Sequence, residues 1–136
     1  MKNRLRKSFQ SNTVLVVDDE PIIRDILLDS FERYGAKVLC AENGQSAIEK
    51  FLSYKVDLVV SDIRMPGSDG LTLLSKIRAL NGQTPVILVT GFADFTTALP
   101  LGASALFVKP FDPQILLVKA AELISIRNET ELQNGR

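Results

Sequence analysis

The sequence predicts an α/β fold: a doubly wound parallel sheet of five strands with helices packed against it. Five short apolar runs, rich in Val, Leu and Ile, alternate with segments whose apolar residues recur every three to four positions. The apolar runs are nearly continuous rather than alternating with polar residues, which is typical of strands buried on both faces of a parallel sheet. No internal repeat or linker interrupts this order.

The run at residues 56–62 is the expected central strand, and it ends on a carboxylate, Asp62. Pro66 and Gly67 follow and prevent the strand from continuing. In open α/β sheets, ligands bind outside the carboxyl ends of the strands, so Asp62 is a candidate functional residue. Asp is also common in turns, so the position alone leaves a capping role open.

The other elements follow from the same signals. Pro21 suits the first turn of a helix, Gly35 ends that helix, and Asn81-Gly82 marks a turn. A short helical pattern at 94–99 is cut off by Pro100, so we expect a shortened or irregular fourth helix. The expected strands are 13–17, 37–41, 56–62, 85–90 and 105–108, and the other expected helices are 21–34, 45–53, 71–80 and 113–126.

Length and composition limit the classes of protein that the chain can represent. Its 136 residues suffice for one domain, and 46% hydrophobic with 24% charged residues is ordinary for a globular protein without a membrane span. A single cysteine, Cys40, excludes an internal disulfide and a cysteine metal cluster. The chain has no histidine, which leaves carboxylates and the hard cations that they bind.

The two ends differ from the middle in charge. Four basic residues and no acidic ones lie in the first twelve positions, while the remainder carries an excess of acidic residues. We expect residues 1–11 to form a basic flexible tail, although a contact with nucleic acid or an acidic partner is an alternative. The polar residues 128–136 are expected to form a second tail or part of a truncated linker.

Polar side chains follow four of the expected strands. Asp18 and Asp19 follow the first strand; Asp62, Thr90 and Lys109 lie at the ends of the third, fourth and fifth. If the strands are parallel, these side chains meet at one edge of the sheet, where three carboxylates repel each other unless positive charge compensates them. Mg²⁺ or a similar hard ion, together with Lys109, supplies such compensation.

A carboxylate, an ammonium group, a hydroxyl donor and a bound cation together form a set suited to phosphoryl transfer. The carboxylate is the expected nucleophile, forming an aspartyl phosphate. Each residue also has an ordinary structural role available, such as a helix cap for the two aspartates or a surface ion pair for Lys109. Their coincidence at four strand ends favours the chemical interpretation.

Four short motifs lie at the ends of the expected strands: Val-Val-Asp-Asp-Glu-Pro at 16–21, Ser-Asp-Ile-Arg-Met-Pro-Gly-Ser-Asp-Gly at 61–70, Val-Thr-Gly at 89–91 and Val-Lys-Pro-Phe at 108–111. Together they resemble the receiver domain of bacterial two-component response regulators, over residues 12–127. The resemblance implies a (βα)5 flavodoxin-like fold with strand order 2-1-3-4-5.

The resemblance also implies roles for individual residues. Asp62 is similar to the family's phosphoacceptor. The implied Mg²⁺ ligands are Asp19, Asp62 and the main-chain carbonyl of Arg64, with Asp18 acting through a metal-bound water. Lys109 is expected to pair with the phosphoryl oxygens, Thr90 to report phosphorylation through its hydroxyl, and the Lys109–Pro110 bond to be cis.

Two positions depart from the family pattern. Where the family usually carries a Tyr or Phe that follows the threonine, this chain has Leu106, and its aromatic residue, Phe107, lies on the opposite face of the strand. The segment from Thr90 to Gly102 is also about three residues short, roughly 4.5 Å of helix. The phosphorylation chemistry is therefore predicted to be intact, while the usual path of its readout is altered.

The sequence thus predicts a signalling phosphoacceptor that catalyses only its own phosphorylation and dephosphorylation. The implied partners are a sensor histidine kinase or histidine phosphotransfer protein and a downstream output domain or protein, with a homodimer on activation left open. The resemblance implies a cytoplasmic location, without direct contact to nucleic acid or membrane.

Two other functions compete with this prediction. An interaction-only receiver, which binds partners without phosphorylation, is favoured by Leu106 and opposed by the complete set of acidic, hydroxyl and lysine residues. A Mg²⁺-dependent phosphatase normally needs an acid/base carboxylate two residues after the nucleophile, and this chain has Arg64 there.

Overall fold

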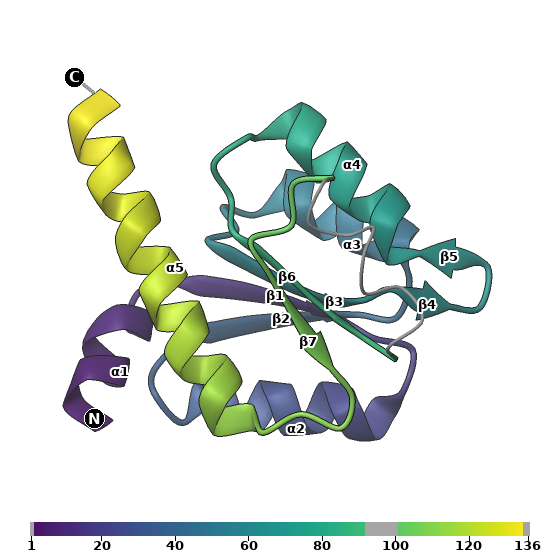
Figure 1. Cartoon of the computed structure of the whole chain (residues 1–136), viewed down its shortest axis with the longest axis horizontal. Coiled ribbons are helices and arrows are strands. Elements are labelled where there is room, and N and C mark those ends of the chain that lie inside the picture. Colours follow the sequence, from purple (N-terminus) through teal and green to yellow (C-terminus); the bar gives the residue numbers. More distant parts are fainter. Residues whose placement is uncertain (1, 92–100, 135–136) are drawn as a thin grey trace.

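The computed structural model describes residues 2–91 and 101–134, and it contains one five-stranded parallel sheet (Figure 1). The order of the strands is β2-β1-β3-β6-β7, which confirms the predicted order 2-1-3-4-5 because β6 and β7 are the fourth and fifth strands of this sheet. The strands are β1 (Thr13–Val17), β2 (Lys37–Ala41), β3 (Leu58–Asp62), β6 (Val86–Thr90) and β7 (Ala105–Val108).

Helices cover both faces of this sheet (Figure 1). The helices α1 (Lys2–Phe9), α2 (Pro21–Glu32) and α5 (Pro113–Asn134) lie on one face, and α3 (Gly44–Ser53) and α4 (Gly70–Leu80) lie on the other. Between β3 and α4, the short strands β4 (Arg64–Met65) and β5 (Ser68–Asp69) form a small antiparallel pair. The predicted α/β fold is therefore confirmed.

Alternating side chains of the strands divide the core into two apolar clusters. Val16 and Val60 belong to the cluster beneath α2 and α5, whereas Leu15 and Val59 belong to the cluster beneath α3 and α4. Each of these four side chains is at most 1% exposed. Successive strand residues point to opposite faces, so a strand covered on both sides must be apolar at every position.

Side chains cap two helices at their first turn. The side chain of Asn43 accepts a hydrogen bond from the backbone N–H of Ser46 (2.8 Å), and Asp69 accepts one from Leu71 (2.7 Å). Pro21 occupies the first turn of α2, where a missing N–H costs nothing. These local signals place the amino-terminal ends of α2, α3 and α4 beside the carboxyl edge of the sheet.

The amino-terminal segment differs from the predicted flexible tail. Residues 2–9 form α1, in which Leu5 and Phe9 are 1% and 0% exposed and join the cluster beneath α2 and α5. The ring of Phe9 meets that of Phe31 edge to face, with centroids 5.2 Å apart. Leu5 and Phe9 are four residues apart, so they lie on the same face of the helix and are buried together, while the basic side chains stay in solvent.

The carboxyl-terminal segment also differs from its prediction, because α5 continues to Asn134 rather than ending near residue 126. The shortened fourth helix predicted after Thr90 falls at 92–100, outside the described residues. Among the helices that the structure describes, none is both long and apolar enough to cross a membrane.

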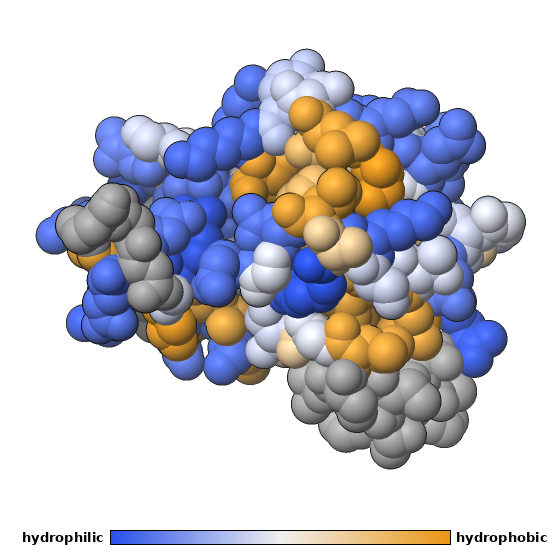
Figure 2. All heavy atoms as spheres, turned by 90° about the horizontal axis from the view of Figure 1, so that it is seen from above, coloured by the Kyte–Doolittle hydropathy of each residue, from blue (hydrophilic) through white to orange (hydrophobic). Residues whose placement is uncertain are grey.

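The face formed by α3 and α4 carries apolar surface among charged side chains, as Figure 2 shows from above. Leu52 and Leu80 are the most exposed apolar residues of these two helices, at 64% and 51%. This face is distinct from the carboxyl edge of the sheet, where the predicted functional residues lie.

A buried ion pair stabilises the amino-terminal edge of the sheet, which lies opposite the carboxyl edge. Nη1 of Arg127, from α5, lies 2.8 Å from Oδ1 of Asp57, whose other oxygen accepts the backbone N–H of Thr13 (2.8 Å). Both charged side chains are less than 10% exposed. The pair links α5 to the starts of β1 and β3, a structural role that the sequence analysis did not assign.

Candidate functional site

The parallel register brings the predicted residues to one edge of the sheet. Val17 pairs with Ser61, Asp62 with Val89, and Thr90 with Val108, so these four neighbouring strands end at nearly the same level. Asp18, Asp62 and Lys109 meet there in direct contact. Thr90 is buried at the end of β6, and its carbonyl oxygen accepts the backbone N–H of Lys109 (2.7 Å).

Asp18 is fixed in place by its backbone and by its side chain. Its N–H donates to the carbonyl oxygen of Ala41 (3.1 Å), and its carbonyl oxygen accepts a hydrogen bond from Nη1 of Arg24 (2.7 Å). Its Oδ1 accepts the N–H of Glu20 (2.9 Å). The residue is 1% exposed. Burial raises the pKa of Asp18; the Glu20 N–H works against that rise, while the charge of Asp62 adds to it.

Asp62 ends β3 and is 6% exposed. Its Oδ1 accepts the backbone N–H of Arg64 at 3.3 Å, and its Oδ2 lies 3.0 Å from Nζ of Lys109. Gly70, the first residue of α4, packs against the backbone here and donates its N–H to the carbonyl oxygen of Ile63 (2.7 Å). A side chain at Gly70 would collide with the carbonyl oxygen of Asp62 and lie 2.8 Å from the Cα of Ile63. A glycine is therefore required where the helix touches the end of β3.

Lys109 contacts three carboxylates at once. Its Nζ lies 3.0 Å from Asp62, 3.1 Å from Glu20 and 3.4 Å from Asp18. Burial by itself would lower the pKa of Lys109, but the hydrogen bond to Asp62 and the attraction of Asp18 outweigh it, so the pKa is raised. The side chain stays charged, and the Lys109–Pro110 bond that follows it is cis, as predicted.

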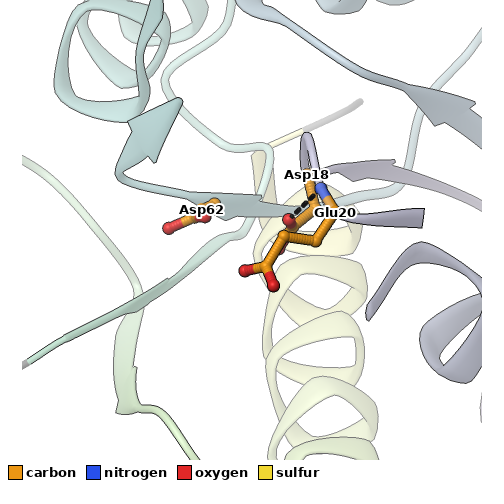
Figure 3. A group of neighbouring side chains, drawn as sticks. All are labelled: Asp18, Glu20 and Asp62. Atoms are coloured by element: carbon orange, nitrogen blue, oxygen red, sulfur yellow. Dashed lines mark hydrogen bonds between the residues drawn. The ribbon is translucent and has the colours of Figure 1, made fainter. Parts of the chain in front are cut away.

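Glu20 is the acidic residue that the sequence analysis did not assign. Among the residues that the structure describes, Asp18, Glu20 and Asp62 form an acidic group whose oxygens lie within 4.8 Å of one another, and Asp19 is not part of it. Figure 3 shows the three side chains at the end of the sheet, with the hydrogen bond that joins Glu20 to Asp18. The sequence does contain a signal for Glu20, because it is the third of three consecutive acidic residues that follow β1.

The charges of this edge suit a hard cation. Three carboxylates share a single ammonium group, which leaves two negative charges in excess at short range. Carboxylate oxygens without histidine or cysteine are the ligands of Mg²⁺ in proteins, usually with several waters retained. The donor set therefore fits the predicted magnesium ion. The main-chain carbonyl of Arg64, predicted as a further ligand, lies two residues beyond Asp62 in β4.

Leu106, at the position where the family usually carries an aromatic residue, and the next residue, Phe107, point to opposite faces of the sheet, as predicted. Leu106 packs with the apolar cluster beneath α3 and α4, and Phe107 packs with the cluster beneath α2 and α5. Leu106 pairs with Leu88 in β6, two residues before Thr90. The side of β7 on which an aromatic ring is usual in the family thus carries an aliphatic side chain.

Comparison with known proteins identifies the family and the fold. A sequence model of the response regulator receiver domain matches residues 14–121. The chain belongs to this family. Receiver domains of response regulators act in two-component signalling and are signalling domains rather than classical enzymes. The helix α1 lies before the matched region.

Sequences similar to this chain occur within longer regulators. The receiver domain is 38% identical over 124 residues to Regulatory protein AtoC of Escherichia coli (strain K12), and 40% identical over 119 residues to Transcriptional regulatory protein AruR of Pseudomonas aeruginosa. These matches cover 87% and 82% of this chain but only 27% and 48% of the relatives. The chain thus spans less than half the length of either relative.

Solved structures of receiver domains superpose over most of the chain. A response regulator receiver domain protein from Clostridium thermocellum matches with a TM-score of 0.82 at 27% identity, covering 88% of this chain and 98% of that one. The response regulator TrrA from Thermotoga maritima, solved in complex with Mg(2+)-BeF, matches with a TM-score of 0.75 at 37% identity, covering 82% of this chain and 98% of that one.

Proposed function

We propose that this receiver domain accepts a phosphoryl group on Asp62 from a phosphohistidine of a sensor histidine kinase or histidine phosphotransfer protein. The observation that carries the proposal is the position of Asp62 at the end of the central strand, with the ammonium group of Lys109 3.0 Å from its Oδ2. Receiver-domain membership and the acidic group beside Asp62 support it.

The transfer makes one bond and breaks one. A carboxylate oxygen of Asp62 attacks the phosphorus, a P–O bond forms, and the P–N bond of the donor breaks. The electron pair of that bond stays on the imidazole nitrogen, which then takes a proton from solvent. Lys109 stabilises the charge on the phosphoryl oxygens. Because the chain has no histidine, the phosphohistidine lies outside this chain.

The cation in this proposal is Mg²⁺. Asp19, Asp62 and the main-chain carbonyl of Arg64 would hold it directly, and Asp18 would act through a bound water. When bound, the ion neutralises charge on the phosphoryl oxygens. The excess negative charge of Asp18, Glu20 and Asp62 supports a cation at this edge, and the ligand set with Asp19 follows from the family resemblance. Mg²⁺ appears with the structurally similar TrrA in its complex with Mg(2+)-BeF.

Phosphorylation is proposed to change a protein-binding face. Thr90 ends β6 beside the site, and its hydroxyl would bond a phosphoryl oxygen and so report the modification. The change would act on a downstream output domain or protein in the cytoplasm, directly or through a homodimer. The similarity to longer regulators such as AtoC supports an output partner.

Incubation with acetyl phosphate, followed by intact-mass measurement, tests the proposal. We expect a mass gain of one phosphoryl group with Mg²⁺ and none when a chelator removes the ion. The variant Asp62→Asn should gain nothing, whereas Asp25→Asn, which removes an exposed carboxylate on α2, should react like the wild type. The same mass gain in Asp62→Asn would contradict the assignment.

One observation favours an interaction-only receiver as the second candidate. Leu106 packs into the core on the face where the family usually places an aromatic switch, so the usual rotamer change is not available to this chain. The same mass measurement separates the two functions. A chain that binds partners but never gains a phosphoryl group supports the second candidate.

A further inference from the structure

All three N–H donors of the Lys109 ammonium group have a carboxylate within reach. An ammonium group has three donors and no acceptor, and Lys109 directs them to Asp62, Glu20 and Asp18. A phosphoryl group on Asp62 needs at least one of these donors. One of the three existing contacts must therefore be given up when the phosphoryl group arrives.

The three partners differ in how firmly they are held. The side chains of Asp18 and Asp62 are 2% and 7% exposed, and both belong to strand ends that are fixed by backbone hydrogen bonds. The side chain of Glu20 is 60% exposed. Its backbone is fixed, because it caps α2 and donates its N–H to Asp18, but its carboxylate extends over the site from the solvent side.

We propose that Glu20 is a positioning residue that restrains Lys109 before phosphorylation and releases it when the phosphoryl group forms. This inference rests on the proposed phosphorylation of Asp62. Glu20 is the contact that breaks at least cost, because an exposed carboxylate regains water when it loses its partner, whereas a buried one does not. Lys109 then donates to a phosphoryl oxygen in place of Glu20.

The restraint predicts that neutralising Glu20 speeds phosphorylation. A glutamine amide holds an ammonium group less strongly than a carboxylate does, so Lys109 reaches the phosphoryl oxygens more readily. Exposed ion pairs contribute between about 0.2 and 1 kcal/mol, which corresponds to an increase in rate of about 1.4- to fivefold for Glu20→Gln. The increase depends on Lys109 and should vanish without it.

The experiment measures the rate of phosphorylation by acetyl phosphate at Mg²⁺ concentrations that saturate each variant, with a separate Mg²⁺ titration followed by NMR. The four chains compared are the wild type, Glu20→Gln, Lys109→Ala and the double variant. Glu122→Gln is the matched control, because Glu122 is 56% exposed and pairs with Lys119 at 3.3 Å on a different surface. Long incubations make the slow Lys109→Ala rates measurable.

Each outcome bears on the proposal. A Glu20→Gln reaction that is about 1.4- to fivefold faster, together with unchanged Glu122→Gln and no gain in the Lys109→Ala background, supports it. An equal gain in that background overturns it, because the effect is then general electrostatics. A loss of Mg²⁺ affinity above about tenfold in Glu20→Gln overturns it, because Glu20 then acts in metal binding and not on Lys109 alone. A wild type that binds Mg²⁺ and reacts at the same rate as Glu20→Gln refutes this inference alone. A wild type that never reacts refutes the proposed function as well.

Discussion

Replacing Phe9 by alanine is predicted to destabilise the domain strongly, although the residue lies in a segment whose composition suggests a tail. The side chain is fully buried in the cluster beneath α2 and α5, and its ring packs edge to face on Phe31 at an interplanar angle of 87°. Deleting a buried Phe side chain typically costs about 3–5 kcal/mol. Alanine is the better helix former, so a loss of stability reports lost packing and not lost helix propensity.

Urea denaturation provides the measurement. The free energy of unfolding falls by about 2 kcal/mol per M of urea, so a loss of about 3–5 kcal/mol in stability lowers the unfolding midpoint by about 1.5–2.5 M urea. The control is Lys7→Ala, which removes an exposed side chain from the same helix and should change the free energy of unfolding by less than about 0.5 kcal/mol. A loss below about 1 kcal/mol for Phe9→Ala would show that α1 does not pack on the domain in solution.

Two further substitutions test the site itself. Asp18→Asn should stabilise the metal-free domain at neutral pH. Because burial raises the pKa of Asp18, its ionised form opposes folding, and the cost grows as pH rises through the carboxyl titration. Thermal unfolding between pH 4 and 7 measures this, and a gain that is equal at both ends of the range counts against the charge explanation. Gly70→Ala should lower stability by about 1–3 kcal/mol, because the added methyl group overlaps the backbone of Asp62 and Ile63. Gly82→Ala is its control, since nothing lies within 4 Å of a Cβ there; equal unfolding midpoints for the two variants would contradict the close contact.

Most of the fold was predictable because its signals are local. Continuous Val, Leu and Ile runs separated by helical periodicity allow few arrangements other than a parallel sheet covered on both faces. Parallel strands end at one edge of a sheet, so the sequence predicts that Asp18, Asp62 and Lys109 meet, and in the structure they do. The positions of strand ends in the sequence thus predict a site even when its members are up to 91 residues apart.

Helix faces were harder to predict, because periodicity does not say which side of a helix has a neighbour. Ile22 and Ile26 follow the helical spacing of α2 but are 72% and 40% exposed, whereas Leu27 and Phe31 are buried. The apolar stripe of α2 is wider than the surface that covers it. Only the packing of α2 against the sheet and against α5 determines which apolar residues enter the core.

The sequence by itself determined the class of fold, the order of its elements and the acidic, hydroxyl and lysine residues at the strand ends, since each depends on neighbours in the chain. The tertiary structure decided which residues from distant parts of the chain join the core, the ion pairs and the site. Phe9 becomes core because Phe31 receives its ring, and Arg127 becomes structural because Asp57 lies beneath α5. Glu20 joins the site because the capping position of α2 directs its carboxylate toward Lys109. Such contacts depend on the relative placement of two elements, and no local pattern encodes that placement.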